Sequence, residues 1–150
     1  MIKDSGERRS FTTGAVRDIQ DGKGRPSLMP LEVALMLNND IIVYYLGRFK
    51  EDGSTAHLLS ALRHFARKVY DGSIETMLLE VSKHFEEGAA KYGDNNWQKG
   101  IPVPCYMDSA IRHYLKHRRG DDDEPHDRAF VWNIMCCIWE VDYHCKEDMK

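Results

Sequence analysis

The sequence predicts an all-α protein, an antiparallel helical bundle with an irregular N-terminal arm. Three observations favour this class. Apolar residues recur at helical spacing in several segments longer than ten residues. Short clusters of glycine, proline and aspartate separate these segments. No segment shows a persuasive alternation of apolar and polar residues, the pattern of a half-buried strand. Helices therefore have to bury their apolar faces against other helices.

The elements are expected in the following order. Residues 1–30 form the arm, because residues 21–26 have the composition of a loop. Pro30 is suited to open a helix, and residues 31–49 keep helical spacing with no glycine before Gly47. A second helix follows the turn at 52–54 and runs over residues 55–70.

Three further segments complete the bundle. A third helix begins near Ser73 and stops at Gly93. Residues 94–104 form a loop, and a fourth helix covers 105–119. After an acidic turn, a fifth helix runs from Pro125 to about residue 145.

The fifth helix is predicted to be the centre of the bundle, because it has almost no polar face. His126, Asn133 and Glu140 interrupt its apolar run at i, i+7 and i+14. Burying such groups without a partner costs several kcal/mol, so each is expected to have one.

The composition excludes several classes of protein. The chain has 150 residues, 42% hydrophobic and 30% charged, which is typical of one globular domain. The net charge of −3 argues against a dedicated nucleic-acid binder. No apolar run approaches the ~20 residues of a membrane span, and the first ten residues contain no secretory core. The cysteines, which form no CxxC pair, are expected to be reduced thiols of a cytoplasmic protein: Cys105, Cys136, Cys137 and Cys145.

Acidic residues recur on several predicted helices. Glu80, His84, Glu87 and Lys91 share one stripe of the third helix. Carboxylates that converge from several helices can hold Mg²⁺ or Mn²⁺. The competing interpretation is an ordinary exposed helix face with i,i+4 ion pairs. The other carboxylates considered are Asp108 on the fourth helix, and Glu124 and Asp127 one turn apart at the start of the fifth.

Cationic side chains near these acids are candidates to bind phosphate oxygens. One group lies in the glycine-rich arm: Arg17, Lys23 and Arg25. The other lies along the second half of the chain: Lys91, Lys99, Arg112 and His113.

Three blocks of sequence carry a resemblance. They are FTTGAVRD with GKGR and LMP within residues 11–30, FEEGAAKYGDNNWQKG at 85–100, and YMDSAIRH at 106–113, continued by Gly120, Asp123, Glu124, His126, Trp132 and Asn133. In these blocks the chain resembles the dATP/dGTP pyrophosphohydrolases of phages and bacteria, a MazG-like all-α group. Residues 31–80 look longer than the family pattern and are expected to be a helical insertion.

The resemblance implies an activity. Such enzymes hydrolyse a purine deoxynucleoside triphosphate to the monophosphate and pyrophosphate, with a divalent metal held by helix carboxylates. It also implies a homo-oligomer, a dimer or a tetramer.

The resemblance implies these roles for residues of this chain. The metal ligands would be Glu87, Asp108, Glu124 and Asp127, with Glu86 and Glu87 as the catalytic carboxylates. Lys91, Lys99 and Arg112 would hold phosphates. Asn95, Asn96 and Trp97 would face the base or sugar, with Trp97 stacked on the purine. The remaining substrate contacts would be Arg17, Lys23, Arg25, His113, His126 and Asn133.

The chain departs from the MazG pattern, because EExxE followed by ExxD is incomplete. Glu124 and Asp127 match the second half by spacing, but Ile111 occupies the position one turn beyond Asp108. The metal ligands of the first half can therefore come from Glu86 and Glu87. The residues on the same helix face as His126 can take the place of Asp127 as ligands.

Two alternatives stay open. One is an HD-type metal phosphohydrolase, built on the single His-Asp dipeptide at 126–127. The other is a helical interaction module without catalysis, such as a phage-encoded inhibitor of a host protein.

Overall fold

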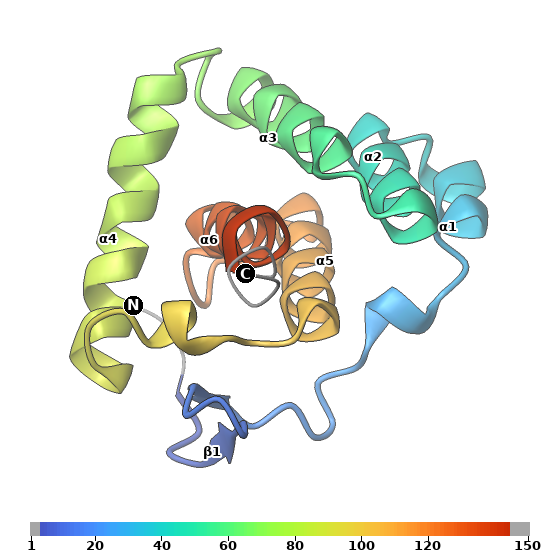
Figure 1. The fold of residues 1–150 in the computed structure, drawn as a ribbon. Coiled ribbons are helices and arrows are strands. Elements are labelled where there is room, and N and C mark those ends of the chain that lie inside the picture. Colours follow the sequence, from blue (N-terminus) through green and yellow to red (C-terminus); the bar gives the residue numbers. More distant parts are fainter. Residues whose placement is uncertain (1–3, 145–150) are drawn as a thin grey trace.

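The computed structural model describes residues 4–144 and confirms the all-α class, with one small two-stranded sheet (Figure 1). Its elements follow in chain order: β1 (Arg8–Ser10), β2 (Val16–Asp18), η1 (Pro26–Leu28), α1 (Leu31–Asn38), α2 (Ile41–Asp52), α3 (Thr55–Val69), α4 (Ile74–Tyr92), η2 (Asn96–Lys99), α5 (Val103–Arg119), α6 (His126–Trp139) and η3 (Glu140–His144). No helix in this described part is long and apolar enough to span a membrane.

Helix α6 lies at the centre, as its apolar sequence predicts. It packs against α5, α4 and α3. Figure 1 shows α5 and α6 side by side inside a frame that α1 to α4 form around them. The core includes Phe130, Val131 and Ile134 of α6, packed with residues from α2, α3 and α5. A helix that is apolar on all sides gains most from this central position.

The three polar exceptions on α6 have partners, as predicted. His126 contacts His113 and Asp123. Asn133 donates to the carbonyl of Ala129, and the Glu140 carboxylate contacts His144 in the π turn η3. Each of these three side chains therefore has at least one partner within the protein.

The single helix predicted over 31–49 is wrong, because the chain forms two helices there. Asn39 adopts a left-handed conformation with φ 48° and ends α1. Asp40 then caps α2, accepting a 2.8 Å hydrogen bond from the amide of Ile42. Asparagine tolerates the left-handed region, and aspartate is a preferred N-cap. The sequence therefore contained a signal for the end of one helix and a signal for the start of the next, although neither residue is proline or glycine.

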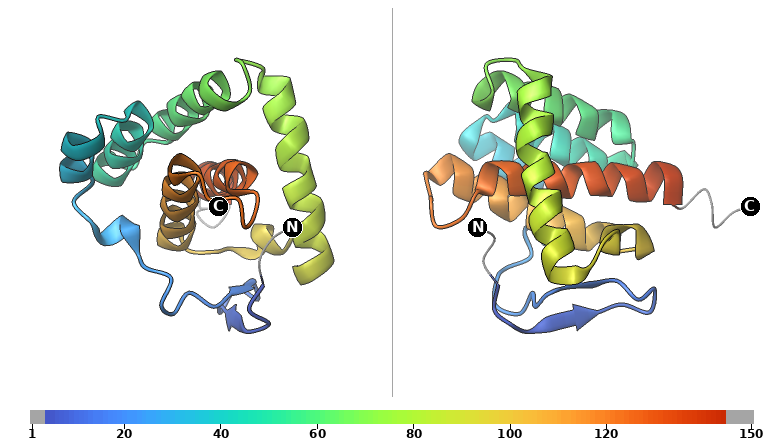
Figure 2. Two further views of the ribbon diagram at one scale, coloured as in Figure 1. Left: turned by 180° about the vertical axis from the view of Figure 1, so that it is seen from behind. Right: turned by 90° about the vertical axis from the view of Figure 1, so that its left-hand side faces the viewer.

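The fully irregular arm is also wrong in part. Strands β1 and β2 form an antiparallel hairpin in which Arg9 faces Arg17. Strands of three residues are too short to show an alternating pattern. Both views in Figure 2 place this hairpin at one end of α4, beside the loop that leads into α5.

Two of the predicted reduced thiols are part of the core. Cys136 and Cys137 are buried and free, and Cys105 is free and half-buried. Burial raises the pKa of the Cys137 thiol to about 12. Cys145 lies outside the described residues. The described cysteines thus serve as small apolar side chains.

Candidate functional site

A cavity of about 410 Å³ lies between the arm and helices α4, α5 and α6. Its volume is within the range of ~300–1,000 Å³ that is usual for small-molecule sites. The lining residues used below are Asp4, Arg9, Arg17, Asp18, Gln20 and Lys23 from the arm, His84 and Tyr92 from α4, Asn96 from η2, Ser109, Arg112, His113 and Lys116 from α5, Glu124 before α6, and Trp132 and Asn133 on α6.

The charge of the lining favours an anion. Five cationic side chains line the cavity against three carboxylates. The cations are Arg9, Arg17, Lys23, Arg112 and Lys116, and the carboxylates are Asp4, Asp18 and Glu124. An excess of positive charge in a concave, partly enclosed site attracts anionic ligands.

Arg17, on β2, is a partly buried cation of this lining. Its Nη2 donates to Ser109 Oγ at 3.3 Å and to Asn133 Oδ1 at 3.2 Å, whereas Nη1 is buried with no partner. Within residues 4–144, no carboxylate pairs with it. Burial lowers the pKa of Arg17. A buried guanidinium without a counter-charge is costly unless an anion completes it.

The hairpin holds Arg17 in place through its neighbour in sequence. The side-chain amide of Asn96 accepts from Val16 N at 2.9 Å and donates to Val16 O at 2.8 Å. The guanidinium of Arg17 lies over the rings of Tyr106 and Trp132, with its carbon 5.5 and 5.7 Å from the ring centroids. The strand, the amide and the two rings together aim a cation into the cavity.

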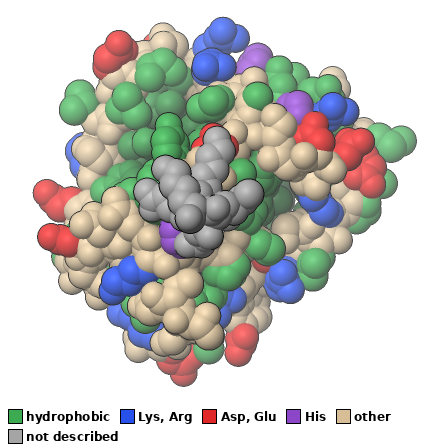
Figure 3. Space-filling model, viewed as in Figure 1, with side chains coloured by type: hydrophobic (Ala, Val, Ile, Leu, Met, Phe, Trp, Pro, Cys, Tyr) green, Lys and Arg blue, Asp and Glu red, His purple; other side chains and the backbone are tan. Residues whose placement is uncertain are grey.

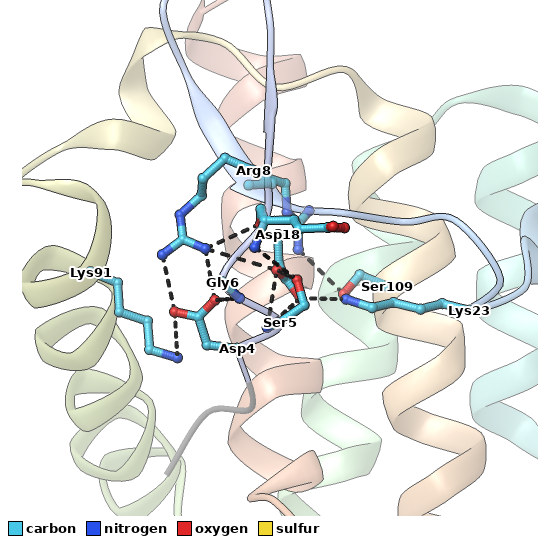
Figure 4. A network of polar contacts seen from close by, with 10 residues as sticks. Asp4, Ser5, Gly6, Arg8, Asp18, Lys23, Lys91 and Ser109 are labelled. Carbon is cyan, nitrogen blue, oxygen red and sulfur yellow. Dashed lines mark hydrogen bonds and ion pairs between the residues drawn. The ribbon is translucent and has the colours of Figure 1, made fainter.

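Polar contacts join residues of the arm to one another and to α4 beside the cavity (Figure 4). Asp4 pairs with Arg8 at 2.7 Å and with Lys91 at 3.8 Å. Asp18 pairs with Lys23 at 2.7 Å. Exposed pairs of this kind are weak, so a phosphate can displace a carboxylate from Lys23 at little cost.

His84 is a buried neutral base on the α4 side of the cavity. Burial, and after it the charge of the nearby Arg128, lowers its pKa to about 4. Its Nδ1 is buried and has no partner in the described part of the chain. The ring lies 5.7 Å from that of Trp132. A neutral imidazole offers one donor and one acceptor to a bound ligand.

We expect His84 to make the fold sensitive to mild acid. The unfolded chain binds a proton at His84 below about pH 6.5, whereas the folded chain resists until about pH 4, so stability falls as the pH drops through this interval. Between pH 7 and pH 5 the loss is about 2 kcal/mol. Urea unfolding at pH 7 and pH 5 measures it, and the fall should be smaller in His84→Gln. An equal fall in that variant would contradict the expectation, and His57→Gln, on α3, is the control.

Two groups of side chains near the cavity can hold a metal ion. One comprises His113, Glu124 and His126, and the other comprises Asp121, Asp123 and His126. In each group the ligand atoms lie within 4.8 Å of one another. His113 and Glu124 also line the cavity. Burial lowers the pKa of His113 to about 2, with His126 as the next cause, so its imidazole is neutral.

The comparison with known families decides the assignment. Residues 70–150 match the family model described as dATP/dGTP diphosphohydrolase, N-terminal. The match covers just over half of the chain. This protein belongs to the dATP/dGTP diphosphohydrolase family. No curated protein and no solved structure matches the chain.

The family match covers only part of the cavity. It begins at the end of α3 and includes α4, η2, α5 and α6. Arg17, Gln20 and Lys23 lie before it, in the arm. The segment that matches the family model thus supplies the helical walls, and the preceding arm adds cationic groups to the same cavity.

Three of the four carboxylates assigned to a metal lie apart from the cavity lining. Glu87 pairs with Arg128. Asp127 accepts from Tyr70 Oη at 2.9 Å. Asp108 accepts from Gln20 Nε2 and Arg25 Nε at 3.0 Å and from Ser27 N at 2.9 Å. Burial alone would raise the pKa of Asp108, but these hydrogen bonds outweigh it and lower the pKa. Glu124 is the one of the four that reaches the cavity.

The other assigned residues divide into two sets. The cavity brings six of them together: Arg17, Lys23, Asn96, Arg112, His113 and Asn133. His126 reaches it through His113, at 2.9 Å. The remainder lie outside the lining: Glu86, exposed on α4; Arg25, on Asp108; Lys91, on Asp4; and Asn95, Lys99 and Trp97 around η2.

Trp97 belongs to an apolar hollow on another side of α6. Its ring lies 5.8 Å from Phe85 and 5.0 Å from Trp139. The hollow has a volume of about 660 Å³ between α3, α4 and α6, and Figure 3 shows hydrophobic side chains gathered in this region. The aromatic side chains that line the polar cavity are instead Tyr92 and Trp132.

Residue patterns could have revealed some of the lining that was missed. His84, Gly88 and Tyr92 follow one another at i, i+4 and i+8, so they share the face of α4 that lines the cavity. Of the stripe predicted from Glu80, His84, Glu87 and Lys91, only His84 is part of this lining. Lys116 and Gln20 carried no comparable signal, because their position depends on how the arm docks.

Proposed function

We propose that the protein hydrolyses purine deoxynucleoside triphosphates, dGTP or dATP, to the monophosphate and pyrophosphate with a divalent metal ion, Mg²⁺ or Mn²⁺. The observation that carries the proposal is the guanidinium of Arg17, which has no carboxylate partner among residues 4–144, in a cationic cavity that Glu124 also lines. Membership of the dATP/dGTP diphosphohydrolase family supports the same reaction.

The cations of the cavity would bind the triphosphate. Arg17 is preorganised for this task, because Ser109 and Asn133 fix its Nη2 and leave Nη1 free for an oxygen. Lys23, Arg112 and Lys116 line the same cavity and would contact the other phosphates. Fixed cations around the phosphates stabilise the charge that shifts to the leaving pyrophosphate.

The residues beside the cavity fit a divalent ion, since they combine a carboxylate oxygen with imidazole nitrogens. When bound, such an ion neutralises phosphate charge and makes water a stronger nucleophile. Glu124 would contribute the carboxylate. Glu86 and Glu87 stay predictions as catalytic carboxylates; Glu87 would first have to leave Arg128.

The aromatic rings would hold the base. Trp132 and Tyr92 line the cavity, and the neutral His84 lies beside Trp132. Large apolar faces beside a few polar atoms are typical of purine sites. This arrangement supports base binding at α4 and α6 rather than at Trp97. The homo-oligomer and the cytoplasmic location also stay predictions.

The test is incubation of the full chain with each dNTP and Mg²⁺ or Mn²⁺, with the products separated by anion-exchange chromatography. We expect a monophosphate and pyrophosphate from dGTP or dATP. Glu124→Gln should lower kcat by about 100-fold or more, as loss of a group that stabilises transition-state charge does. Glu80→Gln, a half-exposed glutamate paired with Lys83 on α4, is the matched control.

Other products would contradict the proposal. Release of inorganic triphosphate would favour an HD-type phosphohydrolase, although Asp127 is bonded to Tyr70 and belongs to neither candidate metal group among residues 4–144. No turnover of any dNTP with either metal would favour the interaction module.

A further inference from the structure

We propose that His113, His126 and Glu124 form a nitrogen-containing metal site that prefers transition ions such as Mn²⁺ or Co²⁺ to Mg²⁺. The inference rests on the proposed function only in assigning the bound ion a role in hydrolysis. Binding can be measured without nucleotide, so the failure of one can be distinguished from the failure of the other.

The first argument is the direction of the His126 lone pair. His126 Nε2 lies 2.7 Å from Asp123 Oδ1. An ionised carboxylate only accepts hydrogen bonds, so Nε2 carries the proton of the neutral ring. The lone pair is then on Nδ1, which faces His113. A carboxylate that fixes a histidine tautomer in this way is the usual support of a metal ligand.

The second argument is the distance between the two imidazoles. Nδ1 of His113 lies 2.9 Å from Nδ1 of His126. Two nitrogens bound about 2.1 Å from one ion and at right angles to each other are about 3.0 Å apart. In the ligand-free protein this contact is a hydrogen bond that His113 Nδ1 donates to His126 Nδ1. When His113 adopts the tautomer with its proton on Nε2, the two Nδ1 atoms have the spacing of neighbouring ligands of an octahedral ion. If the two rings move slightly apart, the distance between the two Nδ1 atoms also fits the wider spacing of ligands around a tetrahedral ion.

The third argument is the completeness and accessibility of the group. A carboxylate oxygen of Glu124 lies within 4.8 Å of one ring nitrogen of each histidine. The C-terminal half of α5 supplies His113, and the start of α6 and the turn before it supply the other two. His126 is buried, whereas His113 and Glu124 are half-buried and line the cavity. An ion held here would face the cavity and could also contact a phosphate there.

The donor set determines the preference among ions. Imidazole nitrogen suits transition metals, whereas Mg²⁺ takes oxygen ligands and keeps much of its water. Replacing two oxygen ligands by two nitrogens therefore lowers the relative affinity for Mg²⁺. The site predicts that Mn²⁺ and Co²⁺ bind at least 10-fold more tightly than Mg²⁺.

Spectroscopy of the full chain tests the site directly. Mn²⁺ is added to the nucleotide-free protein, and pulsed electron paramagnetic resonance detects ¹⁴N coupling to the bound ion. Isothermal titration calorimetry compares the affinities for Mn²⁺, Co²⁺ and Mg²⁺. We expect coupling from imidazole nitrogen and the stated order of affinity. Mn²⁺ binding without nitrogen coupling, no binding of any ion, or a preference for Mg²⁺ would overturn the proposal.

Variants locate the ligands. Glu124→Gln and His113→Gln should weaken Mn²⁺ binding by about 10- to 100-fold, whereas His57→Gln, with its histidine on α3 beside Asp52, should not. Because His126 is buried, His126→Gln is interpreted only if its circular dichroism is that of the wild type. Unchanged binding in both His113→Gln and Glu124→Gln would assign the ion to Asp121 and Asp123, and would overturn the proposal.

Discussion

Replacement of Arg17 by methionine is expected to lower kcat/KM for the preferred dNTP by about 100- to 1,000-fold, the usual effect of removing one preorganised donor to transition-state charge. Methionine preserves much of the side-chain length but removes both the charge and the donors. Arg17 has no carboxylate partner within residues 4–144, so the positive charge that it brings to the cavity is not cancelled locally.

The same variant should change the stability of the ligand-free protein only slightly. It loses the hydrogen bonds to Ser109 and Asn133, but it also removes the cost of burying an unpaired cation. Steady-state kinetics and thermal unfolding measure the two effects. Pyrophosphate should raise the Tm of the wild type and not that of Arg17→Met. Arg48→Met, on α2, is the control, and full activity in Arg17→Met would refute the anion site.

Replacement of Asp108 by asparagine is expected to damage the fold more than the chemistry. The Asp108 side chain is 1% exposed and accepts hydrogen bonds from two arm side chains and the amide of Ser27. Asparagine would direct an N–H group at one of these donors. Hydrogen bonds to a charged group contribute about 1.5–3 kcal/mol, and the 49% exposure of the Arg25 side chain favours the low end. We expect a loss of about 2 kcal/mol.

Urea unfolding and limited proteolysis of the arm measure this loss. The arm of Asp108→Asn should be cut faster than that of the wild type, because η1 loses its anchor on α5. Asp122→Asn, in the exposed acidic turn, is the control. If Asp108→Asn kept its stability and its arm but no longer bound Mn²⁺, Asp108 would be a metal ligand, as the resemblance implies.

The elements that the sequence predicts well are those that local rules determine. Helix α6 is apolar on nearly all sides, so only a central position in the bundle buries it. Ser73 caps the N-terminus of α4 and Gly93 caps its C-terminus, and both residue types are typical of these positions. The break at Asn39 was missed because its signal is a pair of polar residues rather than proline or glycine. The β-hairpin was missed because each strand has only three residues.

The site was harder to predict, because it combines distant segments. Arg17 and Asn133 are 116 residues apart in sequence, yet they share a hydrogen bond. Helical spacing shows which residues lie on one face, but not which face the arm covers. Asp108 was therefore assigned to a metal, whereas the structure places it against the arm. His113 and Glu124 are only 11 residues apart, on α5 and just before α6. Both residues were predicted from the sequence to lie in the site, His113 as a substrate contact and Glu124 as a metal ligand.

Asn96 has a consequence for how copies of the protein meet. A two-stranded hairpin normally leaves unpaired N–H and C=O groups along its outer edges, where another chain can add a strand. The amide of Asn96 has the donor and acceptor of a peptide group, and it occupies both backbone groups of Val16. At this position β2 thus has a side chain in place of a neighbouring strand. The arm is thereby protected at Val16 against edge-to-edge aggregation.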